Sequence, residues 1–187
     1  HSMKDMPSTP AKGLVFTKVW KREDPRDVLI LRTAKHLSEL REDAVIATGS
    51  KRRAFQLLKL RPDLQIINIR GNVDTRLRKM EEQQLDGIVL AAAGLKRLGM
   101  EDVITQYLAP EDMISAPAQG ALALEVREDQ KELQKMLDVF CDEETMNEVC
   151  AERNFLEQMG GSCHTPAGAR CQKTDQGYEL YAMFGNE

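Results

Sequence analysis

The sequence predicts an α/β fold in which helices flank a parallel-rich sheet, and two observations support this prediction. Between residues 44 and 99, short aliphatic runs alternate with amphipathic helical patterns. The connections are only a few residues long, which is typical of parallel strands joined by right-handed helical crossovers. The chain has 187 residues, enough for a sizeable core and one or two domains.

Each element is expected where periodicity and terminating residues agree. Strands are expected at 13–20, 28–31, 44–48, 64–69, 88–91, 113–115 and 120–127, followed by a hairpin of 170–172 with 178–183. Helices are expected at 51–60, from 73 onward, at 92–99, around 133–140 and from 142 to about 159, with a helical turn near 36–40. Pro62 ends the first of these helices because proline cannot continue one, and Asn72 is expected to cap the second.

Charge is unevenly distributed along the chain. The formal net charge is −4, yet residues 51–100 hold eleven Lys/Arg against five Asp/Glu, a local net charge of +6. A basic face on an acidic chain favours a small anionic ligand over a polyanion. No run approaches the roughly 18 apolar residues of a membrane span, and no signal peptide is recognised.

The cysteines and histidines do not predict a metal site. Cys141, Cys150, Cys163 and Cys171 form no C-x-x-C pair, and the three histidines are scattered. We therefore expect reduced thiols in the cytoplasm. Cys163 follows small residues and precedes His164, which could influence the thiol pKa, although a lone loop cysteine is more often a packed or idle thiol.

Three strand-to-helix junctions are basic: 48–53, 70–76 and 93–97. Parallel strands would bring all three to one edge of the sheet, the edge where α/β proteins bind ligands. Unpaired helix N–H groups and arginine side chains would form an anion site there. Positive charge near a helix N-terminus is otherwise unfavourable. From these residues alone, an anion-binding cleft and three solvated helix starts both stay open.

Short stretches of the chain, taken in order, resemble the hydroxymethylbilane synthase family, also called the porphobilinogen deaminases. They are 1–5 (HSMKD), 22–27 (REDPRD), 70–77 (RGNVDTRL), 93–99 (AGLKRLG), 119–121 (QGA), 152–153 (ER) and 161–166 (GSCHTP). The resemblance covers essentially the whole chain. It implies a transferase of tetrapyrrole (porphyrin and heme) biosynthesis that condenses four porphobilinogen molecules head to tail into hydroxymethylbilane, with release of four ammonia molecules.

The resemblance also implies a cofactor and particular site residues. The cofactor is a dipyrromethane, held by a thioether to Cys163. Asp5 matches the catalytic aspartate, which contacts the pyrrole nitrogens. Cofactor-binding roles fall on Cys163, Lys4, Ser50, Arg52, Arg53, Arg70 and Arg76, and substrate-binding roles fall on Arg97 and Ser2.

The family's fold implies three domains, two of them like type II periplasmic binding proteins. Residues 26–115 are then expected to form one complete α/β domain. Residues 1–25 and 116–140 are expected to be remnants of the first domain, and 141–187 a partial α+β third domain that carries Cys163. We expect an internal fragment that lacks the first part of domain 1 and the end of domain 3, and that is inactive by itself.

A second interpretation is a non-catalytic module of the periplasmic-binding type that binds small carboxylates. It needs only the basic junctions and leaves Asp5 and Cys163 without a role. An RNA-binding face is a weaker alternative because the basic junctions carry no aromatic side chains. The expected partner is a small molecule, porphobilinogen, with no nucleic acid and no membrane, and the native protein is expected to be a cytoplasmic monomer.

Overall fold

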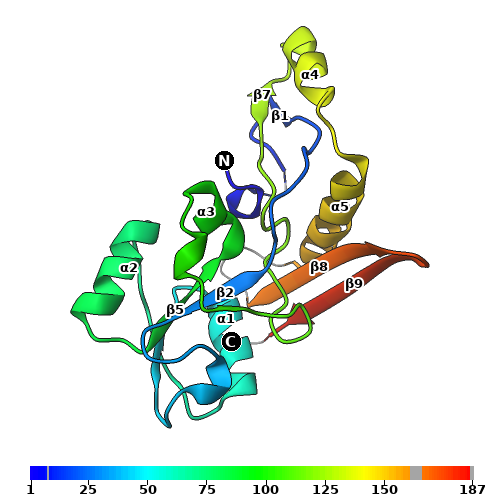
Figure 1. The fold of residues 1–187 in the computed structure, drawn as a ribbon. Helices are drawn as coiled ribbons and strands as arrows, with labels where there is room; N and C mark the ends of the chain where they lie inside the picture. Colours follow the sequence, from blue (N-terminus) through cyan, green and yellow to red (C-terminus); the bar gives the residue numbers. More distant parts are fainter. Residues whose placement is uncertain (8, 161–165, 186–187) are drawn as a thin grey trace.

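A five-stranded sheet organises the lower left part of the molecule as drawn in Figure 1. The computed structural model describes residues 1–7, 9–160 and 166–185. The sheet has the order β4-β3-β5-β2-β6, made by β2 (Asp27–Leu31), β3 (Val45–Ala47), β4 (Gln65–Ile67), β5 (Gly87–Ala91) and β6 (Gln106–Tyr107). β3 runs parallel to β4 and β5, whereas β2 pairs antiparallel with β5 and β6. The predicted α/β class is confirmed, and the sheet is mixed.

Helices cover both faces of this sheet. They are α1 (Lys51–Leu60), α2 (Val73–Glu82) and α3 (Ala92–Arg97). Leu57 of α1 packs into the core on one face. Met80 of α2 and Leu95 of α3 pack into the core on the other face. All five residues of β2 are buried, as expected for a strand covered on both sides.

Side-chain caps fix where the first two helices begin. The Asn72 side chain accepts a hydrogen bond from the Thr75 N–H at 2.9 Å, which confirms the predicted cap of α2. The Ser50 hydroxyl accepts one from the Arg53 N–H at 3.4 Å at the start of α1. α1 ends at Leu60, two residues before the proline, as predicted.

The rest of the chain forms a second group of elements at the upper and right-hand side of Figure 1. They are β1 (Leu14–Phe16), β7 (Glu125–Arg127), α4 (Lys131–Asp138), α5 (Glu143–Gln158), β8 (Ala167–Thr174) and β9 (Gly177–Phe184). Short 3-10 turns occur at Met3–Asp5, Leu37–Glu39 and Glu101–Val103. β1 pairs with β7, and β8 with β9, both antiparallel, so the predicted hairpin is confirmed.

Three strand predictions differ from the structure, and one strand was missed. Residues 113–115 form no strand, because the Ile114 carbonyl accepts hydrogen bonds from the Arg52 and Gln56 side chains at 2.6 and 3.1 Å. The strands predicted at 13–20 and 120–127 are shorter than expected, Leu14–Phe16 and Glu125–Arg127. β6 has only two residues, too few to show a sequence period.

Two crossing segments, 17–26 and 108–124, connect the two groups and touch through their backbones. The Glu23 N–H donates to the Gly120 carbonyl at 3.1 Å. Gly120 has φ +87°, and a Cβ built there would lie 2.2 Å from the Glu23 carbonyl oxygen. Glycine is therefore required at position 120 by both conformation and space.

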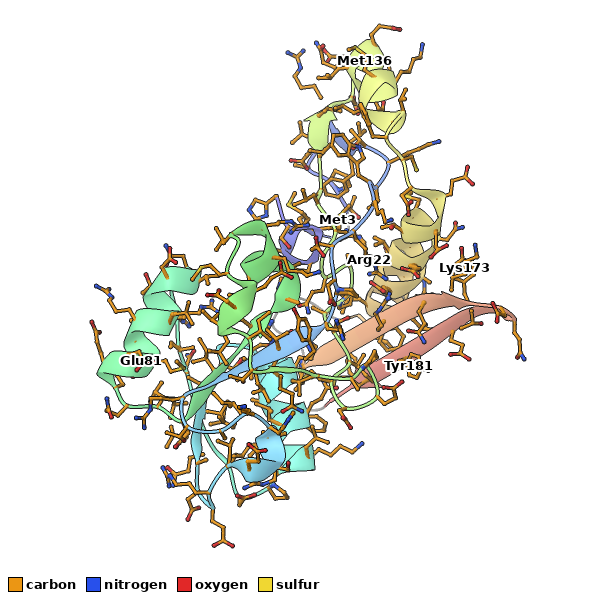
Figure 2. The ribbon with its side chains drawn as sticks, in the orientation of Figure 1. Met3, Arg22, Glu81, Met136, Lys173 and Tyr181 are labelled. Atoms are coloured by element: carbon orange, nitrogen blue, oxygen red, sulfur yellow. The ribbon has the colours of Figure 1, made fainter. Side chains whose placement is uncertain are left out.

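A buried ion cluster joins the first crossing segment to α5 and β8. Figure 2 shows Arg22 beside α5. Arg22 donates to Glu148 at 2.6 Å and to the two oxygens of Glu152 at 2.9 and 3.1 Å. Arg170 of β8 reaches the same two carboxylates at 3.3 and 3.4 Å. Glu152 is fully buried and also accepts two backbone N–H groups, at 2.7 and 2.8 Å. A buried carboxylate held by this many donors ties three distant segments together.

Replacing Glu152 by alanine should therefore destabilise the fold strongly. We expect Glu152→Ala to lower the free energy of unfolding by about 3 kcal/mol or more, because Arg22 and two backbone N–H groups lose a buried partner. The control is Glu132→Ala, which removes an exposed pair with Lys135 and should cost less than about 1 kcal/mol. Urea unfolding of both variants measures this, and equal losses would contradict the assigned role of the cluster.

Candidate functional site

A cavity of about 740 Å³ opens at the edge of the sheet where β3 and β4 end. Its volume is in the range of small-molecule sites. Its walls come from the start of α1, the stretch 66–70, Arg76, the turn Met3–Asp5 and the segment 116–119. The lining cationic side chains are Lys4, Lys51, Arg52, Arg53, Arg70 and Arg76, and among the described lining residues the carboxylate is Asp5.

Sheet topology explains why these side chains meet. β3, β4 and β5 run in the same direction, so the junctions that follow them share one sheet edge, as predicted. Junctions 48–53 and 70–76 contribute to the lining of the cavity. The third junction turns toward the crossing segments: Arg97 Nη2 donates to the Gly120 carbonyl at 2.6 Å, and Lys96 Nζ to Glu23 at 3.1 Å. Arg97 is not among the described residues that line the cavity.

Arg52 and Arg53 share one buried carboxylate, that of Asp27. Arg52 Nη1 donates to Asp27 Oδ2 at 2.7 Å, and Arg53 Nε and Nη2 donate to Oδ1 at 2.9 and 2.7 Å. All three residues are buried. Burial by itself would raise the pKa of Asp27, but attraction by the two guanidinium groups outweighs it and holds that pKa well below its usual value.

Lys4 enters the same group of side chains through Gln119. Lys4 Nζ donates to Gln119 Oε1 at 3.2 Å, and Gln119 Nε2 donates to Asp27 Oδ1 at 2.9 Å. Burial lowers the pKa of Lys4 from 10.5 to about 8, and repulsion by Arg53 adds to the effect. The ammonium form of Lys4 therefore still predominates at pH 7 and loses its proton as the pH rises through about 8.

Arg70 and Arg76 line a more open part of the cavity. Arg70 is exposed and Arg76 half-buried. Arg76 Nε donates to the Gly71 carbonyl at 2.8 Å, which holds its guanidinium at the start of α2. Burial lowers the pKa of Arg76, with a contribution from Arg53. The arrangement suits a ligand with carboxylate groups at more than one position, because each guanidinium can bind a carboxylate in a bidentate manner.

The remaining predicted site residues have different surroundings. Asp5 is exposed and lines the cavity, and its N–H donates to the Ser2 carbonyl at 3.1 Å. Ser2 forms a bridge to Leu122 and is not among the described lining residues. Ser50 lines the cavity at the start of α1. Cys163 lies outside the described residues.

Asp27 and Gln119 are site residues that sequence reasoning did not assign. Both stand within stretches that carry the family resemblance. One signal was available for Asp27, since an acidic residue opens an otherwise aliphatic run, Val28 to Leu31, that predicts a buried strand. Gln119 offered no comparable signal, because its partners lie 92 and 115 positions away in the chain.

Other site chemistries find no support in the described residues. Within 1–7, 9–160 and 166–185, no group of three or more His, Cys, Asp or Glu is arranged to hold a metal ion. In the same ranges, no helix is long and apolar enough to cross a bilayer. A cationic cavity at the carboxyl ends of parallel strands defines an α/β protein with a site suited to small, multiply charged anions.

Comparisons with known proteins agree with this class and identify the family to which the chain belongs. Residues 1–135 match the family model described as "Porphobilinogen deaminase, dipyromethane cofactor binding domain". The whole chain is 55% identical to the porphobilinogen deaminase of Lachnospira eligens and 50% identical to that of Clostridioides difficile, covering 64% and 62% of those proteins. The chain belongs to the porphobilinogen deaminase family.

The chain spans less than two thirds of the length of these curated relatives. Among solved structures, the periplasmic VFT2 domain of Bordetella pertussis BvgS is similar, with a TM-score of 0.43 and 17% identity over 76% of this chain and 60% of that one. This structural similarity is too weak to add to the description of the fold given above.

Binding of a dicarboxylate to the cavity should depend on pH through Lys4. The bound anion favours the charged ammonium, so affinity should be highest below pH 8 and fall as the pH rises through about 8. We expect a loss of about tenfold for succinate between pH 6.5 and 9.5, the effect of one charge-assisted hydrogen bond. Calorimetric titration measures this in a Cys163→Ser variant, which lacks the thiol that the resemblance predicts to carry the cofactor.

The matched controls are Lys4→Met and Lys12→Met, the second at an exposed lysine. Lys4→Met should bind succinate weakly without a step near pH 8, whereas Lys12→Met should keep the step. Retention of the step in Lys4→Met would assign it to another group.

Proposed function

We propose that the full-length protein is a hydroxymethylbilane synthase, or porphobilinogen deaminase. The reaction joins four porphobilinogen molecules head to tail into hydroxymethylbilane and releases one ammonia molecule from each. The observation that carries this proposal is the cationic cavity with Asp5 at its wall, within the region that matches the family's cofactor-binding domain. Each pyrrole ring of such a product chain brings two carboxylates, which explains the excess of cationic side chains.

The described residues fit the dipyrromethane that the family model names. Two rings carry four carboxylates, and the cavity offers six cationic side chains in a volume suited to a small molecule. Ser50, Lys4 and four arginines, Arg52, Arg53, Arg70 and Arg76, would hold those carboxylates. The thioether at Cys163 is part of the proposal. When bound, the group supplies a nucleophilic pyrrole carbon on which the chain of rings grows.

Asp5 is the proposed catalytic residue. Loss of ammonia leaves an electron-poor methylene-pyrrolenine cation on the incoming porphobilinogen, which the Asp5 carboxylate can stabilise. Carbon–carbon bond formation then displaces one proton from the attacked pyrrole carbon. The same carboxylate can accept that proton and relay it to solvent, since Asp5 is exposed. Arg97 and Ser2 are proposed to bind the substrate's carboxylates.

We also propose a cellular location, an oligomeric state and a domain division for the protein. Cys141, Cys150 and Cys171 are free thiols, which supports a cytoplasmic location. A monomer is the proposed native state. The division into a complete domain at 26–115, remnants at 1–25 and 116–140 and a partial domain at 141–187 is also proposed. It agrees with the five-stranded sheet being built within the first of these ranges.

Asp5→Asn in the full-length protein should lower kcat by at least about a hundredfold, because the proton acceptor and the negative charge are lost together. Binding of porphobilinogen should change little. Uroporphyrin formed after acid oxidation measures the product. A wild-type protein that binds succinate tightly but forms no tetrapyrrole would instead support a non-catalytic carboxylate-binding module.

Cys163→Ser should abolish covalent attachment of the dipyrromethane, since a serine oxygen forms no thioether. The intact mass of the full-length variant should lack the increment that the wild type carries. Cys150→Ser is the matched control, because Cys150 is an exposed thiol that does not line the cavity, and it should keep the increment. The increment persisting in Cys163→Ser would move the attachment to another residue.

A further inference from the structure

Asp27 has no role in the reaction described above, yet it is the centre of the polar contacts behind the cavity. It is the first residue of β2 and is fully buried. Its two oxygens accept bonds from Arg52, Arg53 and Gln119 at 2.7 to 2.9 Å. A carboxylate occupied by so many donors fixes the directions of all of them.

The antiparallel direction of β2 puts Asp27 where it is needed. Asp27 pairs with Ala91, the last residue of β5, so the start of β2 lies at the edge where the parallel strands end. Arg52 and Arg53 occupy the first turn of α1, where the helix dipole disfavours cations. Two guanidinium groups against one carboxylate leave an excess positive charge beside the cavity.

We propose that Asp27 is a positioning residue whose carboxylate holds Arg52 and Arg53 in the directions from which they bind ligand carboxylates. Through the side-chain amide of Gln119, the same carboxylate keeps Lys4 beside them. This role rests on the proposed function, in which the ligand is a carboxylate-bearing pyrrole chain. Asp27 itself touches neither substrate nor cofactor.

Removing the charge of Asp27 should also change how Lys4 titrates. The charged groups that act on Lys4 are Asp27 and Asp5, which favour its protonated form, and Arg52 and Arg53, which disfavour it. Loss of the Asp27 charge tips this balance further against the ammonium. A residue that only stabilised the fold would leave the titration of Lys4 where it was.

The decisive variant is Asp27→Asn, which keeps the shape of the side chain and removes its charge. It is made in the full-length protein with Cys163→Ser, so that the cavity holds no covalent group, and succinate is titrated between pH 6.5 and 9.5. We expect binding at pH 7 to weaken at least about tenfold, and the midpoint of the pH dependence to fall by about half a unit or more. Equal or tighter binding, or an unmoved midpoint, would overturn the proposal.

Asp86→Asn is the matched control. Asp86 is a buried acid at the end of the same sheet that accepts bonds from the Val45 N–H and Arg41 at 2.8 and 2.9 Å. It precedes β5 and so lies at the opposite edge from the cavity. Its loss should lower stability while succinate binding stays within about twofold of the parent. A tenfold loss in this variant as well would assign the Asp27 effect to general destabilisation and overturn the proposal.

A measurement on the unmutated side chain covers the case in which Asp27→Asn does not fold. In the ligand-free Cys163→Ser protein, the Arg53 Nε–H should give a slowly exchanging NMR signal at pH 7, because it donates to Asp27 at 2.9 Å. The signal is identified by its absence in Arg53→Lys. The exposed Arg78 should exchange rapidly. Rapid exchange at Arg53 would mean that its guanidinium is not held in place, and would overturn the proposal.

These measurements separate this inference from the proposed function. Succinate binding and the NMR signal require no catalysis, so they can support positioning by Asp27 even if the wild type forms no tetrapyrrole. Conversely, a wild-type protein that forms tetrapyrrole together with unchanged succinate binding in Asp27→Asn would keep the function and reject the positioning role. In the catalytic protein, Asp27→Asn should also lower kcat/KM for porphobilinogen at least about tenfold.

Discussion

Two guanidinium groups sharing one buried carboxylate form the interaction on which the cavity depends. Arg52 and Arg53 lie in the first turn of a helix and are shielded from water, both unfavourable for a cation. Asp27 compensates both costs, and it can do so only because β2 runs against its neighbours and starts at the edge where they end. The mixed sheet is therefore a requirement of the site as well as a feature of the fold.

Local signals in the sequence were enough to predict the repeating part of the fold. The bounds of α1 were predicted correctly because an aliphatic face and a following proline define them. Asn72 capped α2 as expected, and the parallel strands brought the basic junctions to one edge. β6 was missed because two residues are too few to show a sequence period. Residues 113–115 were wrongly predicted as a strand because the distant Arg52 and Gln56 side chains take up the Ile114 carbonyl.

The candidate site, like the fold, could be predicted only where local sequence signals define it. The two junctions that line the cavity can be recognised in the sequence, because basic residues stand beside the end of a predicted strand. The carboxylate and amide that organise them are harder to recognise. Asp27 stands out only as an acid at the start of an aliphatic run, and its contact with Gln119 joins residues 92 positions apart. Glu152 follows the same physical rule elsewhere in the molecule: a buried acid reveals its importance only once its donors, brought from several segments, are known.

Gly120 has an implication for how this chain can evolve. The crossing segments meet there through backbone atoms, and any side chain would occupy the space of the Glu23 carbonyl. At the exposed position of Arg70, by contrast, a different side chain would extend into solvent. No other residue fits at position 120 without a further change, because its side chain would have to push apart the two segments that carry Asp27 and Gln119.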